Sequence, residues 1–182
     1  MSSREYVVRE AKQADADVIA TVHEAGWRAG YAHLFSQDVL ERAIQKHCTR
    51  WTRVLANPEF ENTTILVQER QQQIIGFAHF GPSGNELSSC PRSGRTELYS
   101  FYVHPDHWGT GAATVLLEQV IEILKRRGDK AVYLATAAGT PRSRRFYEKN
   151  GFRETGSTSV YQLLGEVPSV DVEYVFRFVV RA

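Results

Sequence analysis

The strongest constraint on the fold is the stretch of residues 97–124, ELYSFYVHPDHWGTGAATVLLEQVIEIL. It begins with aromatic and β-branched residues typical of a β-strand, turns at residues 104–106, and passes through small residues into an amphipathic helix. The first N–H groups of a helix lack partners within it and carry partial positive charge, so an unobstructed helix start binds anions such as phosphate. The sequence therefore predicts a phosphate site at residues 109–113.

The remaining chain alternates strand-like and helix-like segments in an order that defines the fold class. Predicted strands cover residues 6–9, 63–69, 74–80, 97–103, 130–135, 155–163 and 172–180, and predicted helices about 15–33, 38–55, 113–127 and 141–149. Several neighbouring strands have no helix between them. This order favours one α/β domain, residues 1–182, with a mixed, mostly antiparallel sheet of about seven strands and helices on both faces. A doubly wound dinucleotide fold is disfavoured.

The composition limits the classes of binding partner and the cellular compartment that we expect for the chain. The chain has 22 Lys and Arg against 21 Asp and Glu, so its net charge of +1 gives no global attraction to nucleic acid or to an acidic membrane surface. Cys48 and Cys90 lack metal-ligand spacing and favour two free thiols in a reducing compartment over a redox pair. The N-terminus is charged, and no apolar run approaches membrane-spanning length. We expect a cytoplasmic protein.

Two segments leave alternatives open. Residues 81–95, GPSGNELSSCPRSGR, are a loop by composition, and a connection of that length is either a lid beside a substrate or disordered. The apolar segment 172–180, VEYVFRFVV, either pairs or packs across the subunits of a homodimer or forms a core strand.

Two blocks together resemble the GNAT superfamily of acyl-CoA-dependent N-acetyltransferases. The family has Gln or Arg, two residues, Gly, one residue, then Gly or Ala, and residues 108–113 here read WGTGAA. The preceding YVHPDHW is similar to the family's lead-in, and RRFYEKNGF, residues 144–152, is similar to its C-terminal block. Two blocks in the right order are far more specific than a glycine loop alone. The resemblance covers nearly the whole chain and implies a GNAT-like fold.

The resemblance implies that the bound phosphate is the pyrophosphate of acetyl-CoA, with no metal. It assigns the pyrophosphate to the main chain of Trp108, Gly109, Thr110, Gly111, Ala112 and Ala113. It assigns the pantetheine arm to the backbone of Phe101, Tyr102 and Val103, one of which would present an N–H to the thioester carbonyl. Thr140 and Ser143 are further expected cofactor contacts. Trp108 replaces the usual Gln or Arg, and Thr140 replaces a common Asn.

The same resemblance points to two catalytic residues. Tyr147 occupies the position of a tyrosine that protonates the leaving sulfur, and its ordinary pKa of about 10 keeps it protonated at neutral pH. Without the motif it would be an ordinary aromatic residue on a helix. Glu97 is similar in position to a strand glutamate that serves as the general base in some members. Its alternative is a solvated carboxylate at a strand end.

The acceptor site is expected near the first helix. Glu24, Trp27 and Tyr31 share a helix face by their spacing and are similar in place to the wall of the family's acceptor site, where they would hold a cationic amine. The alternative is that the aromatic residues are core. His79 is expected on an inner strand with reach to the cleft. None of the six histidines has metal-ligand spacing, and each is more simply structural: His23, His33, His47, His79, His104 and His107.

We expect a transferase that moves acetyl from acetyl-CoA to a primary amine by direct attack in a ternary complex, with a small-molecule acceptor. The nearest rival is acetylation of a protein or peptide N-terminus or lysine. A second class is a non-catalytic acyl-CoA sensor. A nucleotide-binding protein is disfavoured because the Lys-Ser/Thr ending of a phosphate-binding NTPase loop is missing.

Overall fold

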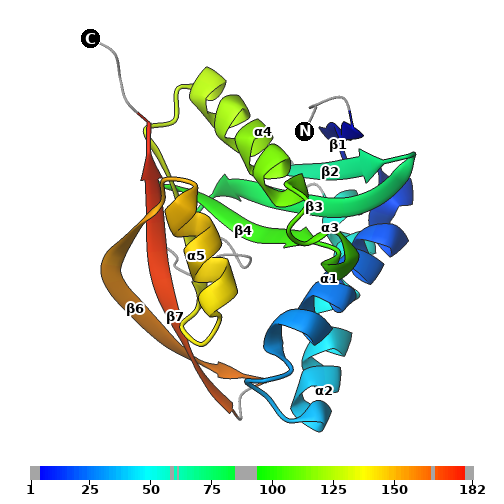
Figure 1. Ribbon diagram of the computed structural model, residues 1–182, viewed down its shortest axis with the longest axis vertical. Coiled ribbons are helices and arrows are strands. Elements are labelled where there is room, and N and C mark those ends of the chain that lie inside the picture. Colours follow the sequence, from blue (N-terminus) through cyan, green and yellow to red (C-terminus); the bar gives the residue numbers. More distant parts are fainter. Residues whose placement is uncertain (1–4, 58–59, 61, 85–93, 165–166, 179–182) are drawn as a thin grey trace. The chain divides into compact units, whose positions relative to one another are not determined.

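The computed structural model describes residues 5–57, 60, 62–84, 94–164 and 167–178 (Figure 1). The strands in this part of the chain are β1 Val7–Glu10, β2 Thr64–Arg70, β3 Gln73–Pro82, β4 Thr96–Val103, β5 Ala131–Ala137, β6 Arg153–Leu163 and β7 Val167–Arg177. The helices are α1 Ala16–Tyr31, α2 Gln37–Cys48, α3 Trp51–Ala56, α4 Ala112–Arg127 and α5 Pro141–Lys149, with short 3-10 turns η2 Gln13–Asp15 and η4 Pro105–His107.

The predicted fold class is confirmed. The described strands form one seven-stranded sheet in the order β1-β2-β3-β4-β5-β7-β6. Pairing is antiparallel between β1 and β2, β5 and β7, and β6 and β7, but parallel between β4 and β5. The sheet is therefore mixed and mostly antiparallel, as expected when hairpins outnumber helical crossovers.

Two compact units share the chain. Unit 1 comprises Met1–His79 and Ser100–Val120, and unit 2 comprises Phe80–Tyr99 and Ile121–Ala182. Because β3, β4 and α4 each contribute residues to both units, neither unit is a separate stretch of sequence. A single domain over residues 1–182 stays a prediction.

Helices pack on both faces of the strands in unit 1. On one face, the Phe77 ring of β3 meets His23 of α1 and Trp51 of α3, with ring centroids 5.5 Å and 4.8 Å apart. On the other face, the buried Gln68 amide of β2 donates to the Ala112 carbonyl at the start of α4, over 2.9 Å. This bond joins the sheet directly to the helix start that the sequence marks as an anion site.

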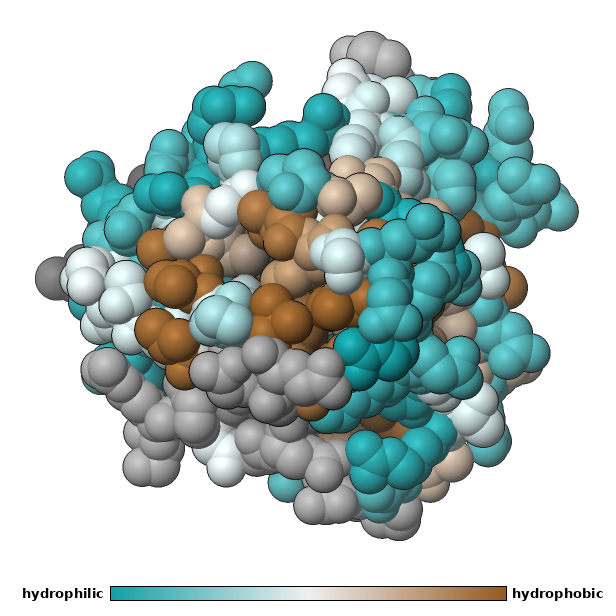
Figure 2. Space-filling model, turned by 90° about the horizontal axis from the view of Figure 1, so that it is seen from below, coloured by the Kyte–Doolittle hydropathy of each residue, from teal (hydrophilic) through white to brown (hydrophobic). Residues whose placement is uncertain are grey.

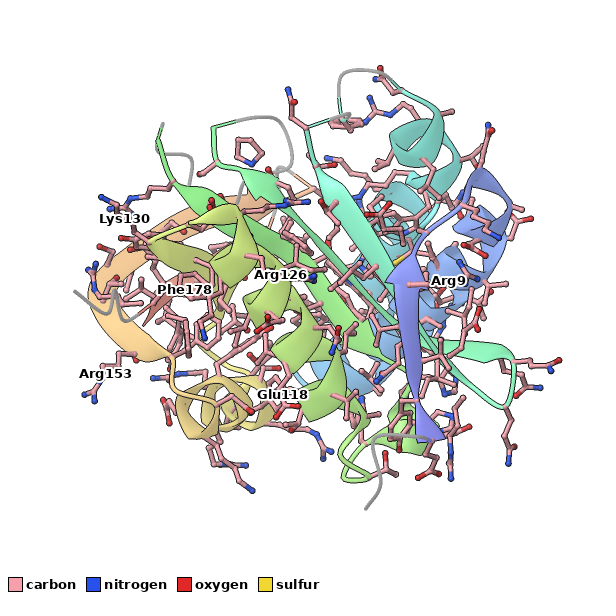
Figure 3. The ribbon with its side chains drawn as sticks, turned by 90° about the horizontal axis from the view of Figure 1, so that it is seen from above. Arg9, Glu118, Arg126, Lys130, Arg153 and Phe178 are labelled. Carbon is pink, nitrogen blue, oxygen red and sulfur yellow. The ribbon has the colours of Figure 1, made fainter. Side chains whose placement is uncertain are left out.

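An ion-pair network holds β1 in unit 1. Arg9 projects from β1 (Figure 3) and pairs with Asp15 of η2 at 2.8 Å and with Glu69 of β2 at 2.7 Å. The Arg9 guanidinium holds the pKa of the Asp15 carboxyl below its usual value. Arg9 thus joins the short strand β1 both to η2 and to β2.

In unit 2, α5 packs on one face of β5, β7 and β6. Tyr174 of β7 has no exposed surface, and its hydroxyl accepts from Arg144 Nε at 3.1 Å and donates to Glu148 at 2.8 Å. Arg144 also pairs with Glu154 of β6 at 2.9 Å. These polar bonds tie the helix to two strands.

Two sequence expectations about element boundaries are wrong. The predicted helix over 38–55 is two helices: α2 ends at Cys48 and α3 begins at Trp51, with the Thr49 hydroxyl between them donating to the Gln45 carbonyl at 2.7 Å. The strand predicted to begin at 172 begins at Val167, which pairs with Leu163 of β6.

The final strand is a core strand and not an edge. β7 pairs with β5 on one side and β6 on the other, so strand pairing across subunits at residues 172–177 is excluded. The alternative stated from the sequence is confirmed for these residues, and Val172 and Tyr174 are buried. Residues 179–180 of that segment, and residues 85–93 of the predicted lid, lie outside the described residues.

Polar and apolar residues are unevenly distributed over the face of the molecule shown in Figure 2. Figure 2 shows hydrophilic residues surrounding a group of apolar residues on one face. No helix in the described ranges is both long and apolar enough to cross a membrane.

Replacing the buried Tyr174 by Phe removes only a hydroxyl that holds α5 to the sheet. We expect Tyr174→Phe to lower the free energy of unfolding by about 1–3 kcal/mol, because Arg144 and Glu148 lose a buried partner. Urea denaturation followed by circular dichroism measures this. A change below about 0.5 kcal/mol would show that the network contributes no net stability.

Candidate functional site

The predicted anion site in unit 1 is a loop of main-chain donors ahead of α4. The described residues show no hydrogen bond from the N–H of Gly109, Gly111 or Ala113. Gly109 and Gly111 have φ of 81° and 92°, a left-handed conformation that favours glycine. A Cβ at either glycine would meet nothing within 4 Å in the described part of the chain, so the space in front of the loop is open. This is the geometry of a phosphate cradle.

Side chains fix the loop from behind. The Trp108 indole N–H donates to the Val103 carbonyl at the end of β4, over 2.7 Å. The Thr110 hydroxyl donates to the His107 carbonyl at 2.8 Å and accepts from the Tyr6 hydroxyl at 3.1 Å. The indole thus closes the loop onto the strand that precedes it, which is a structural role that a Gln or Arg need not play.

The end of β4 is closely packed against β3. A Cβ added at Gly76 would lie 3.1 Å from both the Tyr102 carbonyl oxygen and Val103 Cγ2, so only glycine fits there without a shift. Gly76 was not predicted from the sequence. A single glycine in a strand pattern indicates that another part of the chain lies close to it, but does not show which part. β4 pairs with β5 at Thr96↔Val132 and Glu97↔Tyr133, and the rest of β4, including the predicted pantetheine residues, is outside that register.

The aromatic residues predicted for the acceptor site form a cluster in unit 1. Trp27 is 8 % exposed and contacts Tyr31, with ring centroids 4.8 Å apart, and stacks on His47 at 5.4 Å. Its indole N–H faces His23 Nε2 at 3.0 Å, while the Trp51 indole faces His23 Nδ1 at 3.1 Å. Burial lowers the pKa of His23 well below its usual value. A neutral imidazole has one acceptor nitrogen, so His23 accepts from one indole at a time.

Glu24 and His79, the other predicted acceptor residues, have partners in unit 1. Glu24 pairs with Arg28 at 2.9 Å, and Arg28 also pairs with Glu41 of α2. His79 has no exposed surface, contacts the Trp51 ring and shares a 2.9 Å hydrogen bond with Thr63. Burial lowers the pKa of His79 to about 3, so it is neutral.

The two predicted catalytic residues are in unit 2. Glu97 is 1 % exposed and its carboxylate accepts from the Ser83 hydroxyl at 2.8 Å, so the alternative of a solvated strand-end carboxylate is wrong. Tyr147 is 8 % exposed, and its ring contacts Phe152 and Tyr174 at centroid distances of 5.5 Å and 6.4 Å. Phe152 and Tyr174 therefore hold the Tyr147 ring beside β7.

Thr140 and Ser143 begin α5 in unit 2. The Thr140 hydroxyl donates to the Ala137 carbonyl at 2.6 Å and lies 3.2 Å from the Thr136 hydroxyl. It makes no side-chain cap of α5, so it fixes the turn between β5 and the helix. Ser143 is half-buried on the first turns of α5.

Asp171 of β7 is a titratable residue that sequence reasoning missed. It is 8 % exposed, and in the described chain its carboxylate has neither a hydrogen bond nor an ion pair. Burial raises the pKa of Asp171 to about 6. The sequence placed Asp171 just before the predicted strand 172–180, so the pattern did not indicate its position inside β7.

The comparisons with known proteins identify the family of the chain. Residues 54–152 match the family model described as Acetyltransferase (GNAT) family. The chain belongs to that family. The match spans residues of both units and includes the loop at residues 108–113 and the start of α5.

The sequence relatives of this acetyltransferase carry the name N-acetyltransferase. It is 30% identical over 129 residues to the uncharacterized N-acetyltransferase YuaI of Bacillus subtilis, covering 70% of this chain and 69% of that protein. It is 36% identical over 108 residues to an uncharacterized N-acetyltransferase of Mycobacterium tuberculosis, covering 59% of this chain and 62% of that protein.

Solved structures share the fold at low identity. The PaiA N-acetyltransferase of Thermoplasma acidophilum, in complex with coenzyme A, has a TM-score of 0.75 at 17% identity, over 98% of this chain and 100% of that one. YncA of Salmonella typhimurium, with its cofactor acetyl-CoA, has a TM-score of 0.65 at 20% identity, over 95% and 94%. The protein is an acetyl-CoA-dependent acyltransferase of the GNAT fold.

A glycine substitution tests the loop of the acetyltransferase. Gly111→Ala places a side chain at a left-handed φ and costs about 1–2 kcal/mol, which we expect to weaken coenzyme A binding roughly tenfold. Gly128→Ala, at φ 81° beyond α4, introduces the same strain outside the loop and serves as the matched control. Calorimetric titration with coenzyme A compares them. Equal affinities for both variants would contradict a main-chain cradle at residues 109–113.

The buried Asp171 carboxylate makes a prediction about stability and pH. Because its pKa is raised above that of an unfolded chain, its contribution to stability is present below about pH 4 and is lost as the pH rises through about 6. We expect Asp171→Asn to raise the free energy of unfolding at pH 7.5 by about 1–2 kcal/mol and to remove this pH dependence. Urea denaturation from pH 4 to 8 measures both. A lower stability of the variant at pH 7.5 would contradict an unpaired carboxylate.

Proposed function

We propose that the enzyme transfers acetyl from acetyl-CoA to a primary amine by direct attack in a ternary complex. The observation that carries this proposal is the loop at residues 109–113, in which the N–H groups of Gly109, Gly111 and Ala113 have no partner among the described residues, in a chain of the GNAT family. The pyrophosphate would bind there, and the pantetheine arm would run along Phe101, Tyr102 and Val103. Thr140 and Ser143 would contact the cofactor from the start of α5.

Direct attack fits the state of the cysteine that the structure describes. Burial raises the pKa of Cys48 to about 12, so this thiol is protonated at neutral pH and is a poor acetyl carrier. An acetylated enzyme is therefore not needed in the scheme. The buried free thiol also supports a reducing setting, and we place the reaction in the cytoplasm.

Chemistry requires a neutral amine and a proton for the departing thiolate. Tyr147 is the proposed acid, because a phenol with an ordinary pKa of about 10 is protonated at neutral pH and Phe152 and Tyr174 fix its ring. Glu97 is the base expected from the sequence, although its carboxylate already accepts a hydrogen bond from Ser83.

The aromatic cluster of α1 supports a cationic acceptor. Trp27 and Tyr31 contact each other, and Glu24 adds a partly exposed carboxylate on the same helix. Aromatic faces and a carboxylate attract an ammonium group. His79 would serve as a neutral part of this cluster. A small molecule is the proposed acceptor, since Trp27 and His79 of this group are buried.

Protein acetylation is the nearest alternative. Structures of similar fold include a ribosomal-protein-alanine N-acetyltransferase of Brucella melitensis, with a TM-score of 0.66 at 24% identity. At that identity the likeness supports the fold and not the acceptor. A non-catalytic acyl-CoA sensor is the alternative from another class.

Tyr147→Phe tests the proposal. Thiol release from acetyl-CoA is measured over a panel that contains butylamine, 1,4-diaminobutane, lysine and a peptide with a free N-terminus. We expect turnover by the wild type and a kcat about 10²–10⁴ lower in Tyr147→Phe, with partial recovery when the acetyl thioester carries a more acidic thiol. Coenzyme A binding without turnover of any amine would support the sensor instead.

Tyr99→Phe is the matched control for the loss of a hydroxyl. The Tyr99 hydroxyl donates to the Pro82 carbonyl. We expect its kcat to stay within about twofold of the wild type. If both variants lose activity equally, Tyr147 has no special role as an acid.

A further inference from the structure

One face of the strands in unit 2 carries a buried carboxylate that the proposed chemistry has not used. Asp171 is paired in register with Ala137 of β5 and with Ser159 of β6. Directly opposed residues of antiparallel strands point to the same face. Ala137 offers no donor, and the buried Ser159 Oγ has no hydrogen-bond partner in the described chain. Asp171 therefore faces an unpartnered hydroxyl and a methyl group.

The next acidic residue on this face shows how the fold treats a structural carboxylate. Glu173 is 2 % exposed and is fully engaged: Arg95 lies 3.2 Å away and the Thr155 hydroxyl donates over 2.8 Å. Arg95 in turn lies over the Tyr133 ring at 4.0 Å. Asp171, two residues earlier, has no such cation although it is almost as buried. A structural carboxylate at this depth would be expected to have one.

Asp171 also lies at the end of β5 where the cofactor-binding segment begins. Its register partner Ala137 is the last residue of β5, and the Ala137 carbonyl accepts from both the Thr140 N–H at 3.0 Å and the Thr140 hydroxyl at 2.6 Å. Thr140 begins α5, which carries Tyr147. Hydrogen bonds within a few residues thus connect the Asp171 position to the proposed cofactor contacts.

The acid and this carboxylate are on opposite faces of the same strands. Tyr147 packs against Tyr174, whose hydroxyl bonds to Arg144 and Glu148 of α5. Asp171 and Tyr174 are three residues apart on β7, and alternation places their side chains on opposite faces. In a thioester under attack, the amine approaches the carbonyl carbon from one side while the sulfur departs from it. An acid and a base on opposite faces can reach one thioester where it lies at the end of these strands, and Asp171 pairs with Ala137, the last residue of β5.

We infer that Asp171 binds the ammonium group of the acceptor and takes its proton, and that Ser159 contributes a hydrogen bond beside it. This inference rests on the proposed acetyl transfer and names the base and the charge of the acceptor. Glu97 is then a structural partner of Ser83.

The protons balance as follows. The Asp171 carboxylate takes one proton from the ammonium group, and the neutral amine adds to the thioester carbon. The carbon–sulfur bond breaks, and the thiolate takes the Tyr147 hydroxyl proton. The nitrogen of the adduct loses its second proton to water, and water restores the proton of Tyr147. One amide, one thiol and one net proton result.

The residues around Asp171 determine how its carboxyl group titrates. Ser159 and Ala137 flank it, Glu173 is paired with Arg95, and Glu97 shares the face from β4 through the Glu97↔Tyr133 and Tyr133↔Val175 pairings. Burial is the cause of its raised pKa, with no charged neighbour contributing. A base with this property is ionised at neutral pH yet still accepts a proton readily.

The deciding experiment is the pH profile of kcat/KM for 1,4-diaminobutane, or for the best amine of the panel, in the wild type, Asp171→Asn and Glu97→Gln. For the wild type we expect a bell with an acid limb near pH 6 and an alkaline limb near the pKa of the amine. For Asp171→Asn we expect a loss of 10²–10⁴-fold at pH 7, no acid limb, and a rate that rises with pH as free amine appears. Glu97→Gln tests the base expected from the sequence, and an acid limb that is lost in Asp171→Asn but survives in Glu97→Gln supports Asp171.

The controls separate this role from a structural one and from failure of the proposed function. Asp171→Asn should melt at or above the wild-type temperature at pH 7.5, and Val160→Thr, at an exposed position of β6, should have wild-type kinetics. An acid limb that persists in Asp171→Asn, or an equal loss in Glu97→Gln, would overturn the inference while leaving acetyl transfer intact. A wild type that turns over no amine would overturn the proposed function itself.

Discussion

The structure depends on main-chain N–H groups that the fold leaves without partners at the start of α4. Gly109 and Gly111 turn the chain in the left-handed region, Trp108 and Thr110 hold the loop from behind, and Gln68 anchors the first helical carbonyl to the sheet. None of these bonds uses the N–H groups of Gly109, Gly111 or Ala113. An anion completes such a site because it supplies acceptors and favourable charge together.

The polar groups of unit 2 divide between two faces of its strands. On the α5 face, Tyr174, Arg144 and Glu148 satisfy one another and hold the helix that carries Tyr147. On the other face, Arg95 and Thr155 satisfy Glu173. Asp171 differs from all of these because no donor compensates its burial among the described residues. An uncompensated carboxylate reduces stability, and enzymes retain such groups where a ligand provides the missing charge.

The sequence predicted the fold class and the loop well because both depend on local patterns. Strand alternation, the helix start at residues 112–113 and the glycine spacing are read within a few residues of one another. It missed the break between α2 and α3, and it left open whether residues 172–180 form a core strand, because pairing on both sides is a long-range property. Glu97 and Asp171 could not be ranked from sequence, since burial and the Ser83 bond depend on residues far along the chain. The roles of Tyr147 and of the acceptor residues stay predictions.

A crystal structure with coenzyme A and the amine that is turned over best would test the central claim most directly. We predict pyrophosphate oxygens within hydrogen-bond distance of the N–H groups of residues 109–113, the sulfur beside the Tyr147 hydroxyl, and the amine nitrogen beside the Asp171 carboxylate. A pyrophosphate bound away from this loop, or an amine bound with Asp171 still unpartnered, would contradict it.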